Sequence, residues 1–224
     1  MIHTSSLVHD DLPCMDDDMM RRGKASTWAE FGEDIGVLAG DALMMYAFET
    51  ASCAFETSVD PDELSRIGKA IGILARKTGV YGMIGGQTVD VELAGGPIPA
   101  DKLDFIYHLK TGALIEASML IGAVLGGAAD EDCKIVESLA SKIGMAFQIQ
   151  DDILDVTGSE EIIGKPVNSD EKNKKTTYVT LEGLEKAKQD VEKISAEAIE
   201  ELNKLPGNND FLEQLIHLLI HRQK

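Results

Sequence analysis

The chain has 224 residues, of which 44% are hydrophobic, and this is enough apolar material for one substantial core in a single domain spanning residues 1–224. Asp and Glu total 39 against 21 Lys and Arg, so the formal charge of −18 argues against binding to nucleic acid or to an anionic lipid surface. The three cysteines form no CxxC pair and no apolar run approaches about 20 residues, so we expect no disulfide framework, no zinc site, no membrane span and a cytoplasmic location.

The opening segment and the long apolar stretch after it both indicate helices. Residues 1–9 are mostly apolar or small and are followed directly by an acidic cluster. No N-cap signal precedes them, so this segment resembles the middle of a helix, and we expect the chain to begin inside a larger protein. Apolar residues recur at steps of three and four over residues 28–55, which predicts one long, mostly buried helix. The turn "SVDPDE" follows, with Asp60 as the N-cap of the next helix and Pro61 at its first position.

Helical periodicity continues through most of the remaining chain, with little strand-like alternation. Five further helices are expected over 61–93, 100–127, 130–156, 180–205 and 211–221. Glycines in "GVYGMIGGQTVDVE" predict a bend in the first of these helices, and the polar, aperiodic segment 157–178 is expected to form a loop. The pattern therefore predicts an all-α bundle of at least six helices.

Aspartates gather in two clusters, and each cluster follows an apolar helical stretch. The first comprises Asp10, Asp11, Asp16, Asp17 and Asp18, and the second comprises Asp151, Asp152 and Asp155. Asp151 and Asp155 lie one helical turn apart on the same face, where carboxylates repel one another and oppose the helix dipole. Carboxylates are also poor core residues, so we expect a cation to compensate them.

Mg²⁺ is the cation that the two clusters favour. It takes oxygen ligands and commonly uses one or two carboxylates together with phosphate oxygens and water. Two facing clusters would clamp a diphosphate, and the planar guanidinium groups of Arg21 and Arg22 suit phosphate oxygens. A solvated acidic surface is the ordinary alternative for either cluster alone, but the repetition of the pattern argues against coincidence. The spacing excludes a calcium loop of the EF-hand type.

The residues around both clusters resemble the motifs of the trans-isoprenyl diphosphate synthases, the head-to-tail prenyltransferases of isoprenoid biosynthesis. "DDLPCMD" at 10–16 resembles the long form of the first aspartate motif of this family, and "DDILD" at 151–155 resembles the second. The segments "RRGK", "GGQ", "KTGALI", "GKP" and "KKTTY" match as well, in the order and spacing of the family. The resemblance runs over the whole chain.

The resemblance implies antiparallel helices around a central active-site cavity, usually in a homodimer, and elongation of an allylic diphosphate by isopentenyl diphosphate. The Mg²⁺ ligands that it implies are Asp10, Asp11, Asp16, Asp151, Asp152 and Asp155, with the first, third and fourth as the strongest candidates for direct ligands. The diphosphate-binding residues that it implies are Arg21, Arg22, Lys110, Lys165 and Lys175. Without the motifs, Lys110 and Lys165 would be interpreted as ordinary surface lysines.

The implied chemistry begins with breakage of the allylic C–O bond, which leaves a pyrophosphate anion and a carbocation. Mg²⁺ would act as a Lewis acid on the leaving group, and Lys110, Lys165 and Arg21 would add positive charge. The Thr111 hydroxyl and the Gln148 amide would steady the carbocation without trapping it, while water is excluded. The isopentenyl double bond then attacks the carbocation, and a proton leaves to the released pyrophosphate.

Two small residues before the first motif bear on the length of the product. In the family, a bulky aromatic residue five positions upstream of the motif stops growth at farnesyl diphosphate. This sequence has Ser5 at that position and Ser6 next, and Ser5 lies about 7.5 Å along the helix axis from Asp10. Small side chains leave room for a longer tail, so we expect geranylgeranyl diphosphate, with farnesyl diphosphate as the alternative. His9, beside the motif, is expected to hydrogen-bond rather than to bind the metal.

The sequence departs from the family at its N-terminus. Family members carry several dozen further residues there, including a glycine-lysine-arginine segment that binds the diphosphate of isopentenyl diphosphate. The expectation is therefore a fragment, or a protein with damaged activity. Its uncovered apolar surface predicts poor solubility or reliance on a partner. A non-catalytic regulatory subunit is an alternative on this ground, although the intact aspartate motifs argue against it. A terpene cyclase shares the DDxxD chemistry but does not need "RRGK" and "KTGA", which argues against that class.

Overall fold

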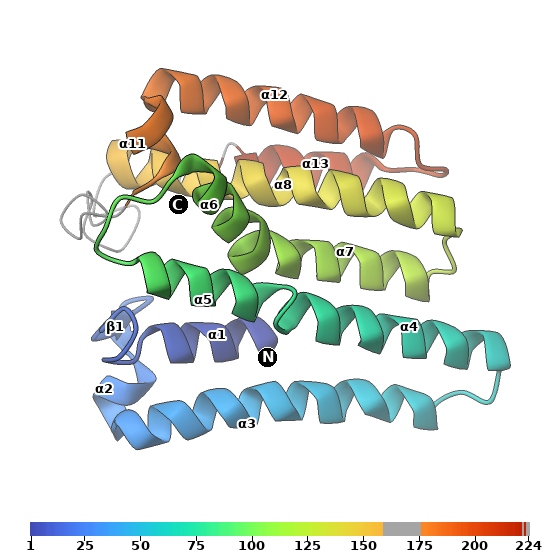
Figure 1. Ribbon diagram of the computed structural model, residues 1–224. Coiled ribbons are helices and arrows are strands. Elements are labelled where there is room, and N and C mark those ends of the chain that lie inside the picture. Colours follow the sequence, from blue (N-terminus) through green and yellow to red (C-terminus); the bar gives the residue numbers. More distant parts are fainter. Residues whose placement is uncertain (159–175, 221, 223–224) are drawn as a thin grey trace. The chain divides into compact units, whose positions relative to one another are not determined.

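The residues described by the computed structural model are 1–158, 176–220 and 222. Their contacts divide the chain into two compact units, Met1–Ile71 and Gly72–Lys224, and the boundary falls within helix α4 (Pro61–Thr78). Figure 1 shows that helices make up nearly all of the regular structure in the described part of the chain. The predicted all-α class is confirmed, whereas a single domain over the whole chain stays a prediction.

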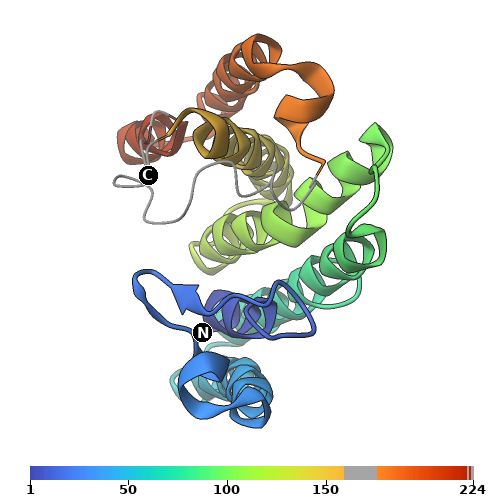
Figure 2. The same cartoon turned by 90° about the vertical axis from the view of Figure 1, so that its left-hand side faces the viewer.

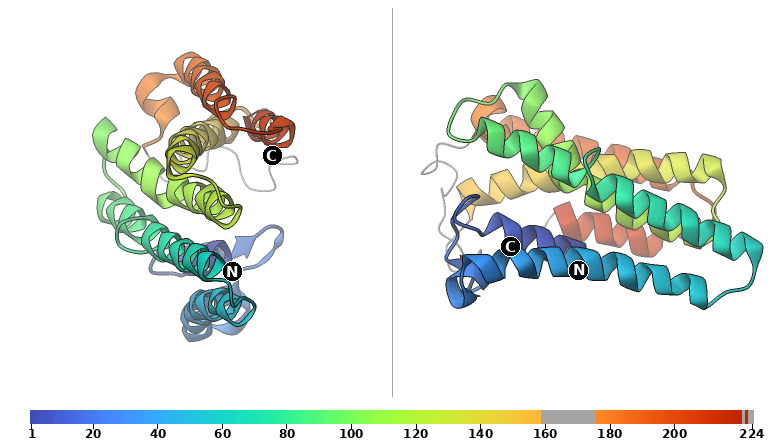
Figure 3. Two further views of the ribbon diagram at one scale, coloured as in Figure 1. Left: turned by 90° about the vertical axis from the view of Figure 1, so that its right-hand side faces the viewer. Right: turned by 60° about the horizontal axis from the view of Figure 1, so that its bottom comes forward.

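The first unit is built on the packing of helix α1 (Ile2–Asp10) along helix α3 (Glu33–Ser52), as Figures 1 and 3 show. The ring of His9 on α1 packs directly against Gly40 of α3, because a Cβ added there would lie 2.1 Å from Nε2 of His9. The same His9 nitrogen donates a hydrogen bond to the carbonyl oxygen of Val37 at 3.1 Å. His9 therefore fastens α1 to α3.

A short hairpin follows α1, and the periodicity of the sequence did not predict it. Strand β1 (Met20–Arg21) pairs antiparallel with strand β2 (Lys24–Ala25). Arg22 and Gly23 both have positive φ and form the two-residue turn between the strands, which is the conformation that tight hairpins require. Two-residue strands are too short for alternation to reveal them.

The helix predicted over 28–55 is wrong in its first part, because a glycine divides it. Helix α2 (Thr27–Phe31) ends at Gly32, whose φ of +102° is incompatible with a continuing helix, and α3 begins directly after it. Figure 2 shows α2 beside the start of α3. A 3₁₀ turn η1 (Cys53–Glu56) then leads toward α4, where the side chain of Asp60 accepts the N–H of Asp62 at 2.8 Å. This bond confirms the predicted N-cap.

The second unit is organised around its longest helix, α8 (Asp130–Thr157). The other elements are the end of α4, α5 (Met83–Leu93), α6 (Ala100–Ile106), η2 (Tyr107–Gly112), α7 (Ala113–Leu125), α11 (Tyr178–Glu182), α12 (Leu184–Leu202) and α13 (Asp210–Ile220). Figures 1 and 3 show α8 between α7 and α12. Apolar residues of α8 recur at helical spacing and pack with those of α12 and α13 in one cluster: Leu139, Ile143, Ile149, Ile153, Ala187, Val191, Ala198, Leu202, Ile216 and Ile220.

Three of the predicted helices are interrupted, one as expected and two not. The helix predicted over 180–205 is wrong at its start, because Gly183, with a φ of +85°, separates α11 from α12. The helix predicted over 61–93 breaks between Thr78 and Met83, which confirms the predicted bend. The helix predicted over 100–127 contains a π-helical turn, η2, which we call the π-turn. A π-turn carries one residue too many for regular helical hydrogen bonding, and such turns often occur at functional sites. Most of the loop predicted over 157–178 lies outside the described residues.

One stretch of the described chain, Ala100–Leu125, is long and apolar enough to cross a membrane by length and composition alone, with a mean hydropathy of 1.3. The core helix of a soluble protein meets the same criterion. This stretch contains Glu116, which is 1% exposed and accepts a hydrogen bond from Lys77 Nζ at 2.5 Å. A carboxylate held in a buried ion pair fits the interior of a protein better than hydrocarbon.

Candidate active site

The backbone of the first aspartate motif folds back on itself after α1. The N–H of Asp16 donates to the carbonyl of Asp10 at 2.9 Å, and the N–H of Asp18 donates to the carbonyl of Asp11 at 3.1 Å. Asp17 lies between them with a φ of +53°, a conformation that aspartate tolerates better than most residues. The loop thus gathers the aspartates of the motif within a few residues of the end of α1.

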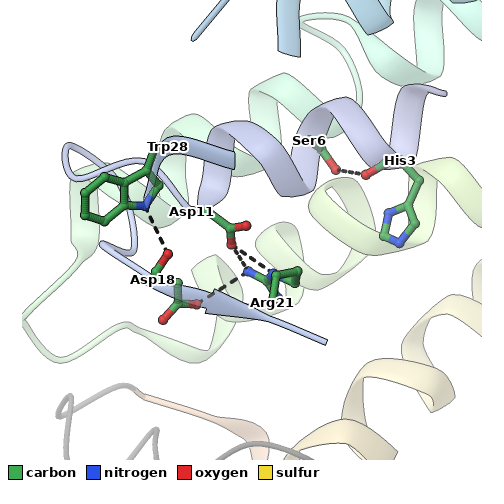
Figure 4. Close-up of polar contacts among 6 residues, drawn as sticks. All are labelled: His3, Ser6, Asp11, Asp18, Arg21 and Trp28. Atoms are coloured by element: carbon green, nitrogen blue, oxygen red, sulfur yellow. Dashed lines mark hydrogen bonds and ion pairs between the residues drawn. The ribbon is translucent and has the colours of Figure 1, made fainter. Parts of the chain in front are cut away.

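Arg21 joins this loop to the hairpin, as Figure 4 shows. Its Nε donates to Oδ1 of Asp11 at 2.8 Å, a second bond runs from Nη2 to the same oxygen, and Nη2 lies 3.4 Å from Asp18. The hydrogen bond to Asp11, which is only 3% exposed, raises the pKa of Arg21. Trp28 also donates from Nε1 to the carbonyl of Asp18 at 3.0 Å. Arg21 therefore organises the first motif, while Arg22 is exposed at the turn of the hairpin.

The two serines assigned to the product pocket lie on α1. Ser5 is completely buried, and its hydroxyl donates to the carbonyl of Ile2 at 2.7 Å. Ser6 is partly exposed and donates to the carbonyl of His3 at 3.0 Å (Figure 4). Both hydroxyls are thus used within the helix, and their small size is the property that matters for a neighbouring ligand.

The three aspartates of the second motif have different surroundings on α8. The side chain of Asp151 is 49% exposed and bonds to the guanidinium of Arg222, which also stacks over the ring of Phe147 at 3.6 Å. Burial lowers the pKa of Arg222, and the carboxylate of Asp151 opposes that effect. Asp152 and Asp155 are each only 4% exposed. Asp151 is therefore the carboxylate of this motif that solvent and a ligand can reach.

Asp152 is held by two donors. Its Oδ2 accepts the hydroxyl of Tyr107 at 2.5 Å and the backbone N–H of Tyr178 at 2.8 Å. Tyr178 in turn donates its own hydroxyl to Asp190 at 2.8 Å, and burial together with this bond raises the pKa of Tyr178.

The π-turn presents two of the predicted catalytic residues to partners in the second unit. Lys110 Nζ donates to Oδ2 of Asp90 on α5 at 2.7 Å. The hydroxyl of Thr111 donates to Oε1 of Gln148 on α8 at 2.8 Å, so the structure brings these two predicted residues together. Lys165 and Lys175 lie outside the described residues. Sequence reasoning missed Asp90, although it follows "GGQ" by three positions and so lies on the same face of α5 as Gln87.

Glycines allow two helices to reach the backbone of the π-turn. A Cβ added at Gly86 of α5 would lie 2.3 Å from the backbone nitrogen of Lys110. A Cβ added at Gly144 of α8 would lie 2.7 Å from the Cα of Gly112. Because real Cβ contacts are never this short, both positions require glycine, and the turn is confined from both sides.

The donor chemistry of both motifs fits Mg²⁺. Asp16 in the first unit and Asp151 in the second present exposed carboxylate oxygens, and Mg²⁺ is typically held by one or two carboxylates together with phosphate oxygens and water. No three acidic, histidine or cysteine side chains in the described part of the chain converge closely enough to hold a metal ion by themselves. Phosphate oxygens and water are the usual further ligands of Mg²⁺ beside such carboxylates.

Comparisons with known proteins agree with this chemistry. The sequence profile of the polyprenyl synthetase family matches residues 1–217. A heterodimeric geranylgeranyl pyrophosphate synthase large subunit of Arabidopsis thaliana is 45% identical over 90% of this chain and 55% of its own length. A farnesyl diphosphate synthase of Geobacillus stearothermophilus is 43% identical over 84% of this chain and 63% of its own length.

Solved structures of prenyl-transferring enzymes are also similar to this chain. A geranyltransferase from Helicobacter pylori, crystallised with magnesium and isoprenyl diphosphate, superposes with a TM-score of 0.83 at 36% identity, covering 98% of this chain and 70% of that one. An FPP/GFPP synthase from Zymomonas mobilis superposes with a TM-score of 0.82 at 32% identity, covering 98% of this chain and 72% of that one. The chain spans little more than half the length of the plant relatives that it matches. It belongs to the polyprenyl synthetase family.

Proposed function

We propose that this protein is a Mg²⁺-dependent prenyltransferase that condenses isopentenyl diphosphate with an allylic diphosphate and yields geranylgeranyl diphosphate. The observation that carries the proposal is the π-turn. It places Lys110 beside Asp90, and it places the Thr111 hydroxyl within hydrogen-bonding distance of Gln148. Gln148 stands three residues before the second aspartate motif. The polar pair thus lies about one helical turn before the second aspartate motif, and Lys110 adjoins Thr111 in the same π-turn. The family membership and the named synthases among the relatives support the same reaction.

The reaction consumes one allylic C–O bond and makes one C–C bond. When bound, Mg²⁺ would neutralise charge on the departing pyrophosphate, and we propose that the two aspartate motifs hold it there. Lys110 would bind the same leaving group, held in place by its bond to Asp90. The dipoles of Thr111 and Gln148 would stabilise the allylic carbocation at C1. The double bond of isopentenyl diphosphate then attacks C1, and the proton lost from its C2 passes to pyrophosphate.

An assay of product formation tests this proposal. The purified chain is incubated with Mg²⁺, radiolabelled isopentenyl diphosphate and farnesyl diphosphate, and the products are separated by chromatography. We expect a C20 diphosphate from the wild-type chain and loss of product in Asp10→Ala, with both proteins folded by circular dichroism. A folded wild-type chain that gives no product would contradict the proposal and favour the non-catalytic subunit.

The size of residue 5 is expected to set the product length. Ser5→Phe places a large ring at a fully buried position of α1, and we propose that accommodating this ring takes space from the growing tail. With geranyl diphosphate as the primer, we expect the ratio of C15 to C20 product to rise by on the order of tenfold, since the added ring excludes several methylene groups. The matched control is Thr4→Phe, at an exposed position of the same helix. An unchanged ratio in Ser5→Phe would place the wall of the pocket elsewhere.

We also propose a homodimer, located in the cytoplasm. Helix α3 supports the dimer because it exposes large apolar side chains, with exposed fractions of 62% for Leu38, 69% for Met45 and 56% for Tyr46. The Arabidopsis relative is named as a subunit of a heterodimer, so a different partner is the alternative. The mass in solution, measured by light scattering for wild type and for Leu38→Glu, distinguishes a dimer from a monomer. Cell fractionation tests the location.

A further inference from the structure

We infer that Asp152 is a positioning residue rather than a metal ligand, and that it acts through Tyr107 to fix the π-turn that carries Lys110 and Thr111. The effect of this link on catalysis rests on the proposed function. The structural part of the inference, the link from Asp152 to the π-turn, can be tested without any substrate.

The surroundings of Asp152 differ from those of Asp151 in the way this role requires. One oxygen of Asp152 already accepts two hydrogen bonds, from the Tyr107 hydroxyl and from the N–H of Tyr178, and the carboxylate is only 4% exposed. Hydrogen bonds to a charged acceptor are stronger than neutral ones, so a metal ion on the same oxygen would leave both buried donors without their partner. Asp151 is 49% exposed, and in the described part of the chain its carboxylate bonds to the guanidinium of Arg222.

Tyr107 connects this carboxylate to the turn. It is the first residue of the π-turn, it is 6% exposed, and Lys110 and Thr111 follow it within the same turn. The N–H of Tyr178 also lies 3.2 Å from the Tyr107 hydroxyl, so the phenol, the carboxylate and the start of α11 form one hydrogen-bonded group. Movement of the phenol would therefore move the backbone that carries Lys110.

Backbone contacts, the pairs described above and a contact of His108 with Ser141 also hold the π-turn. Gly86 and Gly144 bring α5 and α8 against its backbone, and Asp90 and Gln148 hold its two functional side chains. The bond between Asp152 and Tyr107 fixes the first residue of the turn to α8, and the next residue, His108, lies 3.2 Å from the Ser141 hydroxyl of the same helix. Hence one residue of the second aspartate motif positions the lysine and threonine of another motif.

The structural part is tested by amide hydrogen exchange of the ligand-free protein. Tyr107→Phe keeps the ring and removes the hydroxyl, and we expect exchange in peptides covering 107–112 to accelerate by about tenfold. The control is Tyr81→Phe, which removes a phenol hydroxyl from a residue that is 79% exposed. Unchanged exchange at 107–112 in Tyr107→Phe would overturn the inference, whatever the protein catalyses.

The functional part is tested by calorimetry with inorganic pyrophosphate and Mg²⁺ as probes. We expect Tyr107→Phe and Asp152→Asn to weaken pyrophosphate binding by about tenfold while the Mg²⁺ concentration for half-saturation changes less than about twofold. Asp151→Asn should instead raise that Mg²⁺ concentration. If Asp152→Asn raises it as much as Asp151→Asn does, Asp152 is a ligand and the inference fails.

A double-mutant cycle separates positioning from general destabilisation. If Tyr107 acts through Lys110, then Tyr107→Phe in a Lys110→Ala background should weaken pyrophosphate binding no further. Additive losses would overturn the inference. A wild-type chain that binds no pyrophosphate with Mg²⁺ would overturn the proposed function and this catalytic role together, while the exchange result would still decide the structural link.

Discussion

An Asp151→Asn variant is expected to lose about a thousandfold in kcat/KM for the condensation, the largest loss that we expect from any single carboxylate of the second unit. Asp151 is the accessible aspartate of its motif, and its charge is the property that a divalent cation on a diphosphate would need. Asparagine keeps the shape and removes the charge. Initial rates measured over a wide range of Mg²⁺ concentrations check the prediction.

The partner of Asp151 supplies the control. Arg222 has a side chain that is only 16% exposed, so the single variant leaves a poorly solvated guanidinium without its carboxylate, and the melting temperature should fall. The double variant Asp151→Asn/Arg222→Gln removes both charges and should regain part of that stability. Its kcat/KM should stay low. Near wild-type rates in Asp151→Asn at saturating Mg²⁺ would show that the cation is held elsewhere.

A Gly86→Ala variant is expected to lose about a hundredfold in kcat and about 1–3 kcal/mol of stability. The new methyl group would meet the backbone nitrogen of Lys110 at 2.3 Å and the carbonyl carbon of Leu109 at 2.9 Å. Backbone atoms cannot rotate away as a flexible side chain can, so α5 and the π-turn must separate. Because Lys110 bonds to Asp90 across that contact, the separation should displace the lysine that binds the leaving group.

The matched control is Gly122→Ala on α7, where a Cβ would meet nothing within 4 Å. Alanine at an open helical position is expected to stabilise by about 0.5–1 kcal/mol, with kcat unchanged. Urea unfolding and steady-state kinetics on both variants make the comparison. Equal effects of the two substitutions would mean that helix propensity, and not the contact with the π-turn, controls this region.

Local patterns in the sequence were sufficient for most of the secondary structure. The spacing of apolar residues predicted the bounds of α8 to within one residue and the existence of α12, although not its start after Gly183. The glycines before Met83 predicted the break between α4 and α5. The two aspartate motifs and "KTGALI" were sufficient for the family, because such motifs are short and contiguous. These features depend on neighbours within one or two helical turns, which a sequence displays directly.

The tertiary structure determined the surroundings, and so the role, of each residue within a motif. Asp151 and Asp152 are adjacent and identical in type, yet one is half exposed and the other is buried against Tyr107, which lies 45 positions earlier in the chain. Lys110 likewise finds Asp90 twenty positions away, and Thr111 finds Gln148. Such partners depend on how helices pack against one another, and the spacing of residues within a single helix does not predict that packing. The sequence by itself determined the helices and the chemical inventory, whereas packing determined burial and hydrogen-bond partners, and with them the role of each carboxylate.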